Sequence, residues 1–427
     1  MTTAVAELQA KARAAKAASK RMAFLSTEVK NRALHAIAEA LADRQEEVLA
    51  ANRQDYQEAK AAGMAEAMLD RLLLHHQRLE GMAADVRSVA ALPDPVGEMF
   101  DVRTLPNGLI AGRRRVPLGV IGVIYESRPN VTVDIAALCL KSGNACILRG
   151  GKEALRSSQA LATIVAEAAY EQGIPQGAVQ FVDNPDRALV GEMLKMREQI
   201  DLMVPRGGAE LIRYVSETAA MPVVAGGIGV CHSYVDRAAD IDMAVRVVYN
   251  AKCRRPTICN ALDTLLIHAE VAPHFLPPMA QAWAQAGVEM RCDGRALALL
   301  GPHLPEGLKV TPAAPEDFGR EFLALKAAVK IVDSLDEALE HIERYGSGHS
   351  EAIITEDYQA AMRFLAEADA AAVYVNASTQ FTDGAQFGLG AEVGISTQKM
   401  HARGPMGLRE LTTYKWIIMG SGQTRPG

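Results

Sequence analysis

The fold is decided by three short apolar segments, NACILRG (144–150), AVQFV (178–182) and DLMVP (201–205). Helices are predicted between them, over about 152–172 and 186–196, and a third is predicted after Gly208. Parallel strands need a crossover connection, which is usually a helix, so this alternation predicts a parallel α/β sheet. The segment PVVAGG (222–227) continues the pattern as a further strand.

The sequence on the N-terminal side of this sheet has two different patterns. Residues 1–90 carry apolar side chains at helical spacing, for example Leu34, Ile37 and Leu41, which predicts several amphipathic helices. Pro106-Asn107-Gly108 between apolar segments predicts a hairpin over about 98–118 that could carry a subunit contact. Val116–Tyr125 predicts a central strand, since it is far shorter than the roughly 20 residues of a membrane span.

The length of 427 residues predicts two domains, because single cores stop growing at roughly 250 to 300 residues. A second alternating region runs from Ala239 to about Gln398, and the glycines of 222–229 separate it from the first. We therefore expect a cofactor-binding domain over 1–225 with the N-terminal helices, a second domain over 226–402, and a C-terminal oligomerisation segment over 403–427. Within that segment, LRELTTYKWIIMG (408–420) predicts a closing strand.

Composition excludes several classes of protein. The formal charge is -6, whereas a protein that binds duplex nucleic acid needs clustered lysine and arginine. The six cysteines have no paired or CxxC spacing, so neither disulfides nor a metal site is expected. No apolar secretory segment opens the chain, which favours a cytoplasmic protein with reduced thiols and no membrane contact.

One candidate anion site is VPRGG (204–208), where a predicted strand runs into a predicted helix. Free N–H groups and the helix dipole at such a point favour an anion such as pyrophosphate. A plain strand-to-helix turn explains the same residues equally well. The phosphate loop GxGxxG is absent, since Gly226-Gly227-Ile228-Gly229 does not fit it.

A candidate nucleophile is Cys259, in the segment NAKCRRPTICNALDTLLI (250–267). Lys252, Arg254 and Arg255 precede it, and nearby cations lower the pKa of a thiol and so favour the nucleophilic thiolate. A buried structural cysteine is the alternative, and the local sequence leaves the two open.

A third cluster lies in VDSLDEALEHIERYGSGHSEAII (332–354). A predicted helix carrying His341 leads into a loop with Tyr345, Ser347, His349 and Ser350, which could hold an oxyanion or phosphate. For His341 we favour the simpler interpretation, a place on the charged, solvated face of the helix.

Several longer motifs occur together in this chain: IYESRPN (124–130), VPRGG (204–208), VYVNAS (373–378), FTDG (381–384), FGLGAE (387–392) and HARGPMGLRELTTYKW (401–416). With them, the chain resembles the aldehyde dehydrogenase superfamily over almost its whole length, and within it the branch that acts on an acyl phosphate. The resemblance implies an α/β fold with a Rossmann-like cofactor domain, an α/β catalytic domain and a small oligomerisation hairpin. The implied reaction is NADPH-dependent reduction of L-glutamyl 5-phosphate to L-glutamate 5-semialdehyde in proline biosynthesis, through a cysteine thioester.

The resemblance also implies roles for individual residues. Cys259 takes the place of the catalytic thiol, and Glu321 that of the glutamate that holds the nicotinamide ribose. The oxyanion partner is Asn130 or, counting without a gap, Glu126; we prefer Asn130, because an amide can donate a hydrogen bond and a carboxylate cannot.

The remaining implied residues concern the cofactor and the substrate. Arg149 and Lys152 stand where NAD-preferring relatives have a lysine and a glutamate, so a 2'-phosphate, and hence NADPH, is expected. The expected cofactor residues also include Pro205, Arg206, Gly207 and Gly208, and the expected substrate residues are Arg128, His349, Asp383, His401 and Arg403. A homodimer or homotetramer and functional coupling to glutamate 5-kinase are expected as well.

One departure from the wider superfamily narrows the expectation. Hydrolytic members have Glu-Leu-Gly-Gly, with the glutamate activating water, where this chain has Val224-Ala225-Gly226-Gly227. A missing water base suits a thioester that must survive until hydride reaches it. Three rival readings remain: a hydrolytic aldehyde dehydrogenase with another base, a hydrolase using Cys259 with His349, and a non-enzymatic nucleotide-binding scaffold.

Overall fold

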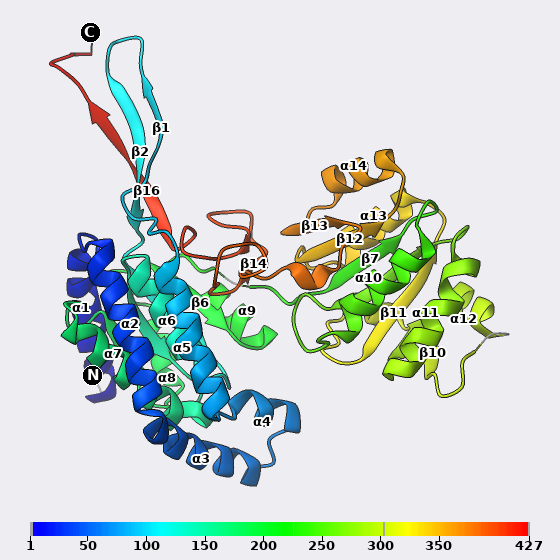
Figure 1. Ribbon diagram of the computed structural model, residues 1–427, viewed down its shortest axis with the longest axis horizontal. Helices are drawn as coiled ribbons and strands as arrows, with labels where there is room; N and C mark the ends of the chain where they lie inside the picture. The colour runs from blue at the N-terminus through cyan, green and yellow to red at the C-terminus, as the bar shows by residue number, and fades with distance from the viewer. Residues whose placement is uncertain (1–2, 225, 302–303, 426–427) are drawn as a thin grey trace. The chain divides into compact units, whose positions relative to one another are not determined.

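The structure is a computed structural model that describes residues 3–224, 226–301 and 304–425. The chain divides into two compact units (Figure 1). The first comprises Met1–Ala225, Gly388–Gly394 and Met406–Gly427, and the second Gly226–Phe387 and Ile395–Pro405. The fold is mixed α/β with parallel sheets, as the sequence predicted.

Five helices open the first unit: α1 (Thr3–Met22), α2 (Thr27–Asp43), α3 (Gln45–Ala61), α4 (Glu66–Leu72) and α5 (His76–Ala91). The second begins where the Ser26 side chain accepts a hydrogen bond from the Val29 N–H, a typical N-cap. Leu34, Ile37 and Leu41 are fully buried along α2. The amphipathic pattern of residues 1–90 is therefore confirmed.

The first sheet has four parallel strands in the order β5 (Val179–Phe181), β4 (Ala145–Arg149), β3 (Val120–Tyr125) and β6 (Leu202–Arg206). The connecting helices are α6 (Asn130–Lys141), α7 (Leu155–Glu171), which follows the short 3-10 turn η1 (Lys152–Ala154), α8 (Ala188–Met193) and α9 (Ala209–Thr218). Every residue of β3 and β4 is buried, as expected for central parallel strands. The α/β alternation predicted from the sequence is confirmed.

Two strand predictions in this region were wrong in part. Val116–Tyr125 is not one strand, because the chain turns at Gly119, whose φ is +130° and where a Cβ would lie 2.2 Å from Asp201 Oδ2. The described residues of 222–227, which leave out Ala225, contribute one bridge, from Val223 to Met203, and do not form a longer strand.

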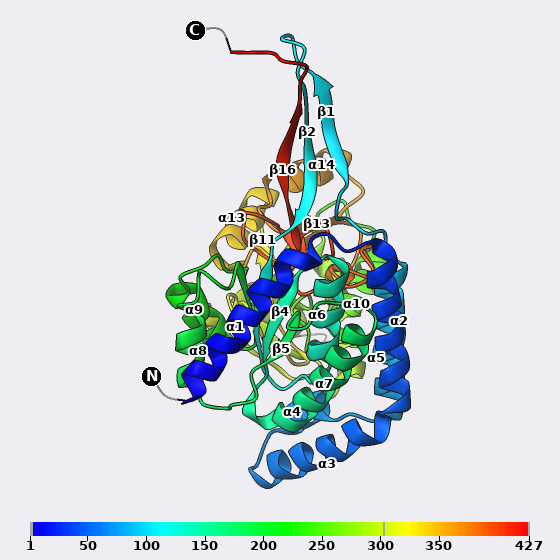
Figure 2. The same cartoon turned by 90° about the vertical axis from the view of Figure 1, so that its left-hand side faces the viewer.

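A three-stranded antiparallel ribbon completes the first unit. It consists of β1 (Met99–Thr104), β2 (Ile110–Pro117) and β16 (Thr412–Met419), with β2 in the middle. The three strands extend together away from the helices of this unit (Figures 1 and 2). The predicted hairpin and the predicted closing strand are thus parts of one sheet.

The second unit is built on seven parallel strands in the order β10 (Val310–Pro312), β9 (Glu289–Cys292), β11 (Lys326–Val332), β8 (Leu262–His268), β7 (Cys231–Val235), β12 (Ser350–Ile354) and β13 (Ala372–Val375). One face packs on α10 (Ile241–Cys253), α11 (Ala272–Ala286) and α12 (Gly294–Leu300), around the buried Phe275 and Trp283. The other face packs on α13 (Leu335–Tyr345) and α14 (Tyr358–Glu367), around Tyr234 and Phe364.

The chain crosses between the two units more than once near its C-terminus. Residues 388–394 and 406–427 cluster with the first unit, whereas 395–405 stay with the second and form the strand pair β14 (Ile395–Ser396) and β15 (Gly404–Pro405). The second domain predicted from the sequence, 226–402, does not contain this interruption at 388–394. Within the part of the chain that the structure describes, no helix is both long and apolar enough to cross a membrane.

Candidate functional site

The strand order of the parallel sheet in the first unit reverses at β3. From β3 the chain proceeds to β4 on one side, and later returns to β6 on the other side of β3. Such a reversal is the point at which open α/β sheets bind ligands. The loops that follow β3 and β6 meet there and contain the motifs IYESRPN and VPRGG.

The side-chain carboxylate of Glu126 lies at the start of α9. The Gly208 N–H donates to Glu126 Oε2 over 2.9 Å, and no side chain caps this helix. Gly207 leaves room for that carboxylate, because a Cβ there would lie 2.4 Å from Glu126 Oε2. The Gly208 N–H at this helix start therefore donates to a carboxylate oxygen, and the binding of a ligand anion at VPRGG stays a prediction.

The two cations predicted to hold a 2'-phosphate have different surroundings. Arg149 is buried, and its Nη2 donates to the carbonyl oxygens of Pro185 and Asp186 over 3.1 and 3.3 Å. Burial lowers the pKa of Arg149. Lys152 is exposed in the turn η1. Of the two, Lys152 is the cation that a ligand can reach from solvent.

Sequence reasoning missed Glu153, the neighbour of Lys152. Its Oε1 accepts hydrogen bonds from the N–H and the hydroxyl of Ser127, over 2.7 and 2.8 Å. Ser127 has a φ of +46°, which is uncommon for a residue with a side chain and requires such outside support. The link joins the loops after β3 and β4, so no local signal in the sequence could have shown it.

The preferred oxyanion partner, Asn130, is the first residue of α6 and is partly buried. Its Nδ2 donates to Asp134 Oδ2 over 2.9 Å. Burial raises the pKa of Asp134 to about 7, although this hydrogen bond acts in the opposite direction. The alternative residue, Glu126, instead accepts from Gly208 as described above.

In the second unit, Cys259 lies in the loop between α10 and β8 and is partly exposed. Gly229 packs directly on its backbone: a Cβ built on Gly229 would lie 1.6 Å from the Cys259 carbonyl oxygen. The thiol of Cys231 donates to the same carbonyl over 3.2 Å. The backbone of the candidate nucleophile is therefore held from two sides.

Glu321 reaches the same place from a distant part of the chain. Its Oε1 accepts a hydrogen bond from the Gly229 N–H over 3.0 Å. Cys259 and Glu321, which are 62 positions apart in the sequence, thus both contact Gly229. The structure brings these two predicted residues together.

Two of the cations that precede Cys259 in the sequence have partners elsewhere in the second unit. Lys252 is completely buried, and its ammonium donates to the Leu262 carbonyl over 2.6 Å and pairs with Asp263. Arg254 Nη1 donates to Gln380 Oε1 over 3.1 Å. Lys252 and Arg254 thus each have a partner other than the Cys259 thiol.

His349 is fully buried rather than exposed to a ligand. Its Nδ1 lies 2.8 Å from Ser350 Oγ and 3.8 Å from Cys231 Sγ. Burial lowers the pKa of His349 to about 4, so the ring is neutral at neutral pH. Ser347, in the same loop, accepts a hydrogen bond from the Val230 N–H over 2.8 Å. His349 and Ser347 are therefore better placed to hold the neighbouring backbone than to contact a substrate.

The prediction that His341 lies on a solvated helix face was wrong. Its ring is buried against the rings of His232, Phe318 and Tyr345, with centroid distances of 5.6, 5.2 and 4.7 Å. Burial lowers its pKa to about 3. The charged neighbours of His341 in the sequence lie on the outer face of α13, and sequence spacing alone did not separate the two faces.

The other predicted substrate residues lie in loops with local contacts. Asp383 Oδ1 accepts from the N–H groups of Ala385 and Gln386, over 2.9 and 3.2 Å. Arg403 pairs with Asp369 over 2.7 Å. His401 is exposed and has a φ of +69°. Arg128 is partly buried in the loop after β3, in the first unit.

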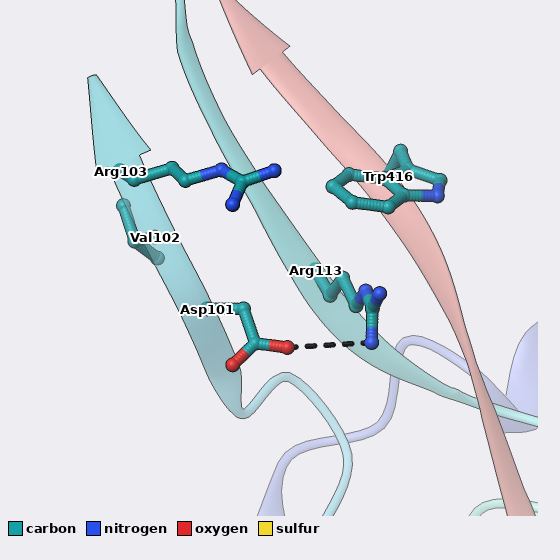
Figure 3. A pocket seen from close by; sticks show the side chains of 5 residues that line it. All are labelled: Asp101, Val102, Arg103, Arg113 and Trp416. Atoms are coloured by element: carbon teal, nitrogen blue, oxygen red, sulfur yellow. Dashed lines mark ion pairs between the residues drawn. The ribbon is translucent and has the colours of Figure 1, made fainter. Parts of the chain in front are cut away.

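A pocket of about 310 Å³ lies on the ribbon of the first unit and is lined by Asp101, Val102, Arg103, Arg113 and Trp416 (Figure 3). The Arg113 guanidinium pairs with Asp101 over 3.3 Å and lies 4.8 Å from the Trp416 ring centroid. None of the residues that carry the proposed chemistry lines this pocket. Among the described residues, no group of three or more His, Cys, Asp and Glu side chains could hold a metal ion.

Comparison with known proteins gives one consistent answer. The model of the aldehyde dehydrogenase family matches residues 2–303. The gamma-glutamyl phosphate reductase of Dehalococcoides mccartyi (strain CBDB1) is 60% identical over 425 residues, which is 100% of each chain. That of Roseiflexus castenholzii is 55% identical over 413 residues, covering 96% of this chain and 97% of the relative.

A solved structure agrees with these relatives. The crystal structure of gamma-glutamyl phosphate reductase from Thermotoga maritima has a TM-score of 0.95 and 47% identity, and covers 98% of this chain and 100% of its own. An acetylating aldehyde dehydrogenase from Geobacillus thermoglucosidasius, at 20% identity and a TM-score of 0.68, shares the fold. The chain therefore belongs to the aldehyde dehydrogenase family and, within it, to the gamma-glutamyl phosphate reductases.

Proposed function

We propose that this chain reduces L-glutamyl 5-phosphate to L-glutamate 5-semialdehyde and phosphate with NADPH, as a step of proline biosynthesis. The observation that supports the proposal most is that Cys259 and Glu321 both contact Gly229. The chain in which they do so belongs to the gamma-glutamyl phosphate reductases. A nucleophile and a cofactor-binding carboxylate are the two groups that this chemistry needs together.

Cys259 opens the reaction as the nucleophile. Its thiolate attacks the acyl carbonyl, the new C–S bond forms, and the C–O bond to phosphate breaks so that phosphate leaves with the electron pair. Backbone N–H groups and the Asn130 amide are the proposed donors to the oxyanion. Asn130 would give up its hydrogen bond to Asp134 for this purpose.

The second step converts the thioester to the aldehyde. The nicotinamide cofactor supplies hydride when bound, and the Cys259 thiolate is then expelled as the aldehyde forms. Val224, Gly226 and Gly227 replace the water-activating glutamate motif of hydrolytic relatives, and Ala225 lies outside the described residues. Lack of that base protects the thioester from hydrolysis until reduction.

The residues present fit a dinucleotide. The Gly208 N–H at the start of α9 already binds a carboxylate, so a pyrophosphate oxygen can take that place when Glu126 moves aside. Pro205, Arg206 and Gly207 belong to the same strand end and loop. Family membership supports a nicotinamide cofactor. We propose NADPH because two cations lie close together in the sequence at the end of β4. Lys152 is exposed, and Arg149, the last residue of β4, is buried.

The substrate carries a phosphate and an amino-acid head, and both need charged partners. We propose Arg128, His401 and Arg403 for its anionic groups and Asp383 for its ammonium group. His349 was expected to join them, but its complete burial favours a supporting role for the loop 345–350.

The ribbon is the proposed subunit contact. Tyr414, Trp416 and Ile418 alternate along β16 and so share one face of the ribbon; they are 46, 51 and 53% exposed, which is unusual for such large side chains close together. We propose a homodimer or homotetramer in the cytoplasm. Because acyl phosphates hydrolyse readily, transfer of the substrate from glutamate 5-kinase would be an advantage.

The reverse reaction tests the proposal. NADP reduction is measured with glutamate 5-semialdehyde, with and without inorganic phosphate, for the wild type and for Cys259→Ala. The expected result is phosphate-dependent reduction that disappears in the variant. Turnover without phosphate would indicate a hydrolytic dehydrogenase, and full activity of Cys259→Ala would exclude this thiol as the nucleophile.

A further inference from the structure

A buried ion pair lies next to the candidate site in the second unit. Lys252, near the end of α10, and Asp263, in β8, have side chains that are 0 and 3% exposed, and Lys252 Nζ lies 3.4 Å from Asp263 Oδ1. Taking both charges out of water costs several kcal/mol per ion, and apolar residues of the same size often stabilise a protein as well or better. Stability alone does not account for this pair.

Lys252 also holds the chain that follows Cys259. Its Nζ donates to the carbonyl of Leu262, three positions after the nucleophile, over 2.6 Å. Hydrogen bonds from an ammonium group are roughly twice as strong as those between neutral groups. The start of β8 is therefore fixed by a charged donor from α10.

Asp263 holds the chain that follows Glu321. Its Oδ1 accepts a hydrogen bond from the Phe322 N–H over 3.1 Å, and the Phe322 ring centroid lies 5.9 Å from Lys252 Nζ. The next residue, Leu323, has a φ of +49°, a conformation that costs energy in a residue with a side chain. This segment consequently needs contacts from outside to keep its shape.

We propose that Lys252 and Asp263 are a positioning pair that holds the segment carrying Glu321 against the segment following Cys259. The inference rests on the proposed function, in which Glu321 binds the cofactor. Neither residue of the pair acts on a ligand directly: Lys252 acts through the Leu262 carbonyl and Asp263 through the Phe322 N–H. Loss of both contacts should therefore weaken cofactor binding through a displaced Glu321, and loss of the Phe322 contact should contribute most, because Phe322 directly follows Glu321.

Two double variants separate positioning from stability. Lys252→Met/Asp263→Asn removes both charges but keeps a side-chain oxygen that can accept from Phe322. Lys252→Met/Asp263→Leu removes both charges and the acceptor as well. Neither leaves an uncompensated buried charge, so both avoid the main cause of misfolding in the single variants.

NADPH binding is measured directly, by titration of the full chain followed by nucleotide fluorescence, together with the melting temperature. The Asn variant should bind NADPH within about 3-fold of the wild type, and the Leu variant about 10-fold more weakly, as expected when one buried hydrogen bond is lost. Equal NADPH affinity of the Leu variant and the wild type would overturn the proposal. So would equal weakening in both variants, because the Phe322 acceptor, which only the Leu variant loses, would then not be what holds Glu321 in place.

Two further variants act as reference and control. Lys30→Met removes another completely buried lysine, which pairs with Asp94 over 2.6 Å in the first unit; it should lower the melting temperature and leave NADPH affinity unchanged. Glu321→Gln should weaken NADPH binding. If it does not, the assignment of Glu321 in the proposed function fails; if it does while the Leu variant binds normally, only the positioning role fails.

Discussion

Gly229 and Cys259 touch through their backbones: a Cβ on Gly229 would stand 1.6 Å from the Cys259 carbonyl oxygen and 2.9 Å from its Cα. Backbone atoms at such distances cannot yield as the end of a flexible side chain can. Gly229 also donates its N–H to Glu321. A single glycine thus contacts both the segment of the proposed nucleophile and that of the proposed cofactor-binding carboxylate.

Replacement of Gly229 by alanine should displace the Cys259 loop. Because misplacement of a nucleophile by about 1 Å can cost about 100-fold in rate, Gly229→Ala should lower kcat by roughly this factor. The measurement is the phosphate-dependent reverse reaction, with alkylation of Cys259 by iodoacetamide to follow thiol access. Gly294→Ala is the control, since a Cβ at Gly294 meets nothing within 4 Å. Wild-type kcat in Gly229→Ala would show that the loop adjusts without consequence.

Replacement of Glu321 by glutamine should affect the cofactor more than the substrate. Glutamine keeps an oxygen that can accept from Gly229, but a neutral amide accepts from ribose hydroxyls more weakly than a carboxylate does. We expect the KM for NADP to rise about 5- to 10-fold, with a smaller change in the KM for the semialdehyde. Steady-state kinetics with each substrate varied in turn provides the test, and an unchanged KM for NADP would contradict the assignment.

Reversal of charge at Lys152 should change cofactor preference. Lys152→Glu places a carboxylate where we expect the 2'-phosphate, so the ratio of kcat/KM for NADP to that for NAD should fall about 10-fold or more. Lys20→Glu is a suitable control, because Lys20 is an exposed lysine of the first unit at the end of α1. An equal ratio in both variants would show that Lys152 is merely a solvated side chain.

Asp134 should make stability depend on pH. Burial raises the pKa of this carboxyl from 3.8 to about 7, against the effect of the hydrogen bond from Asn130. Between these values the folded state binds more protons than the unfolded state, so this group lowers the free energy of unfolding as the pH rises from about 4 to about 7. Asp134→Asn should be more stable than the wild type by about 4 kcal/mol at pH 8 and not at pH 4. Urea unfolding at both pH values measures the difference, and parallel pH profiles would refute it.

The ribbon should control assembly. Trp416→Asp places a charge among exposed apolar side chains and should shift the mass in solution toward the monomer, as measured by light scattering over a range of protein concentrations. Phe24→Asp is the matched control, because Phe24 is 88% exposed and lies between α1 and α2. An unchanged mass in Trp416→Asp would move the subunit contact elsewhere.

Sequence alone determined the class of fold and the nature of the chemistry. The strand β4 within NACILRG is apolar except for Arg149 and is buried on both faces, and that pattern depends only on local composition and period. The amphipathic helices of residues 1–90 and the closing strand of the ribbon were visible for the same reason. Cys259 and Glu321 were found through motif resemblance, which reports residue identity but not surroundings.

Tertiary structure decided what surrounds each of these groups. The sequence placed Lys252 beside Cys259 along the chain, but the helix α10 turns that ammonium toward Asp263. The sequence also predicted His341 on the solvated face of its helix, whereas the His341 ring packs against three other rings. The contacts of Gly229 with Cys259 and Glu321, and of Glu153 with Ser127, join residues far apart in the chain. Local propensity carries no information on such contacts, because they form only when distant strands align in one sheet and bring their loops to the same edge.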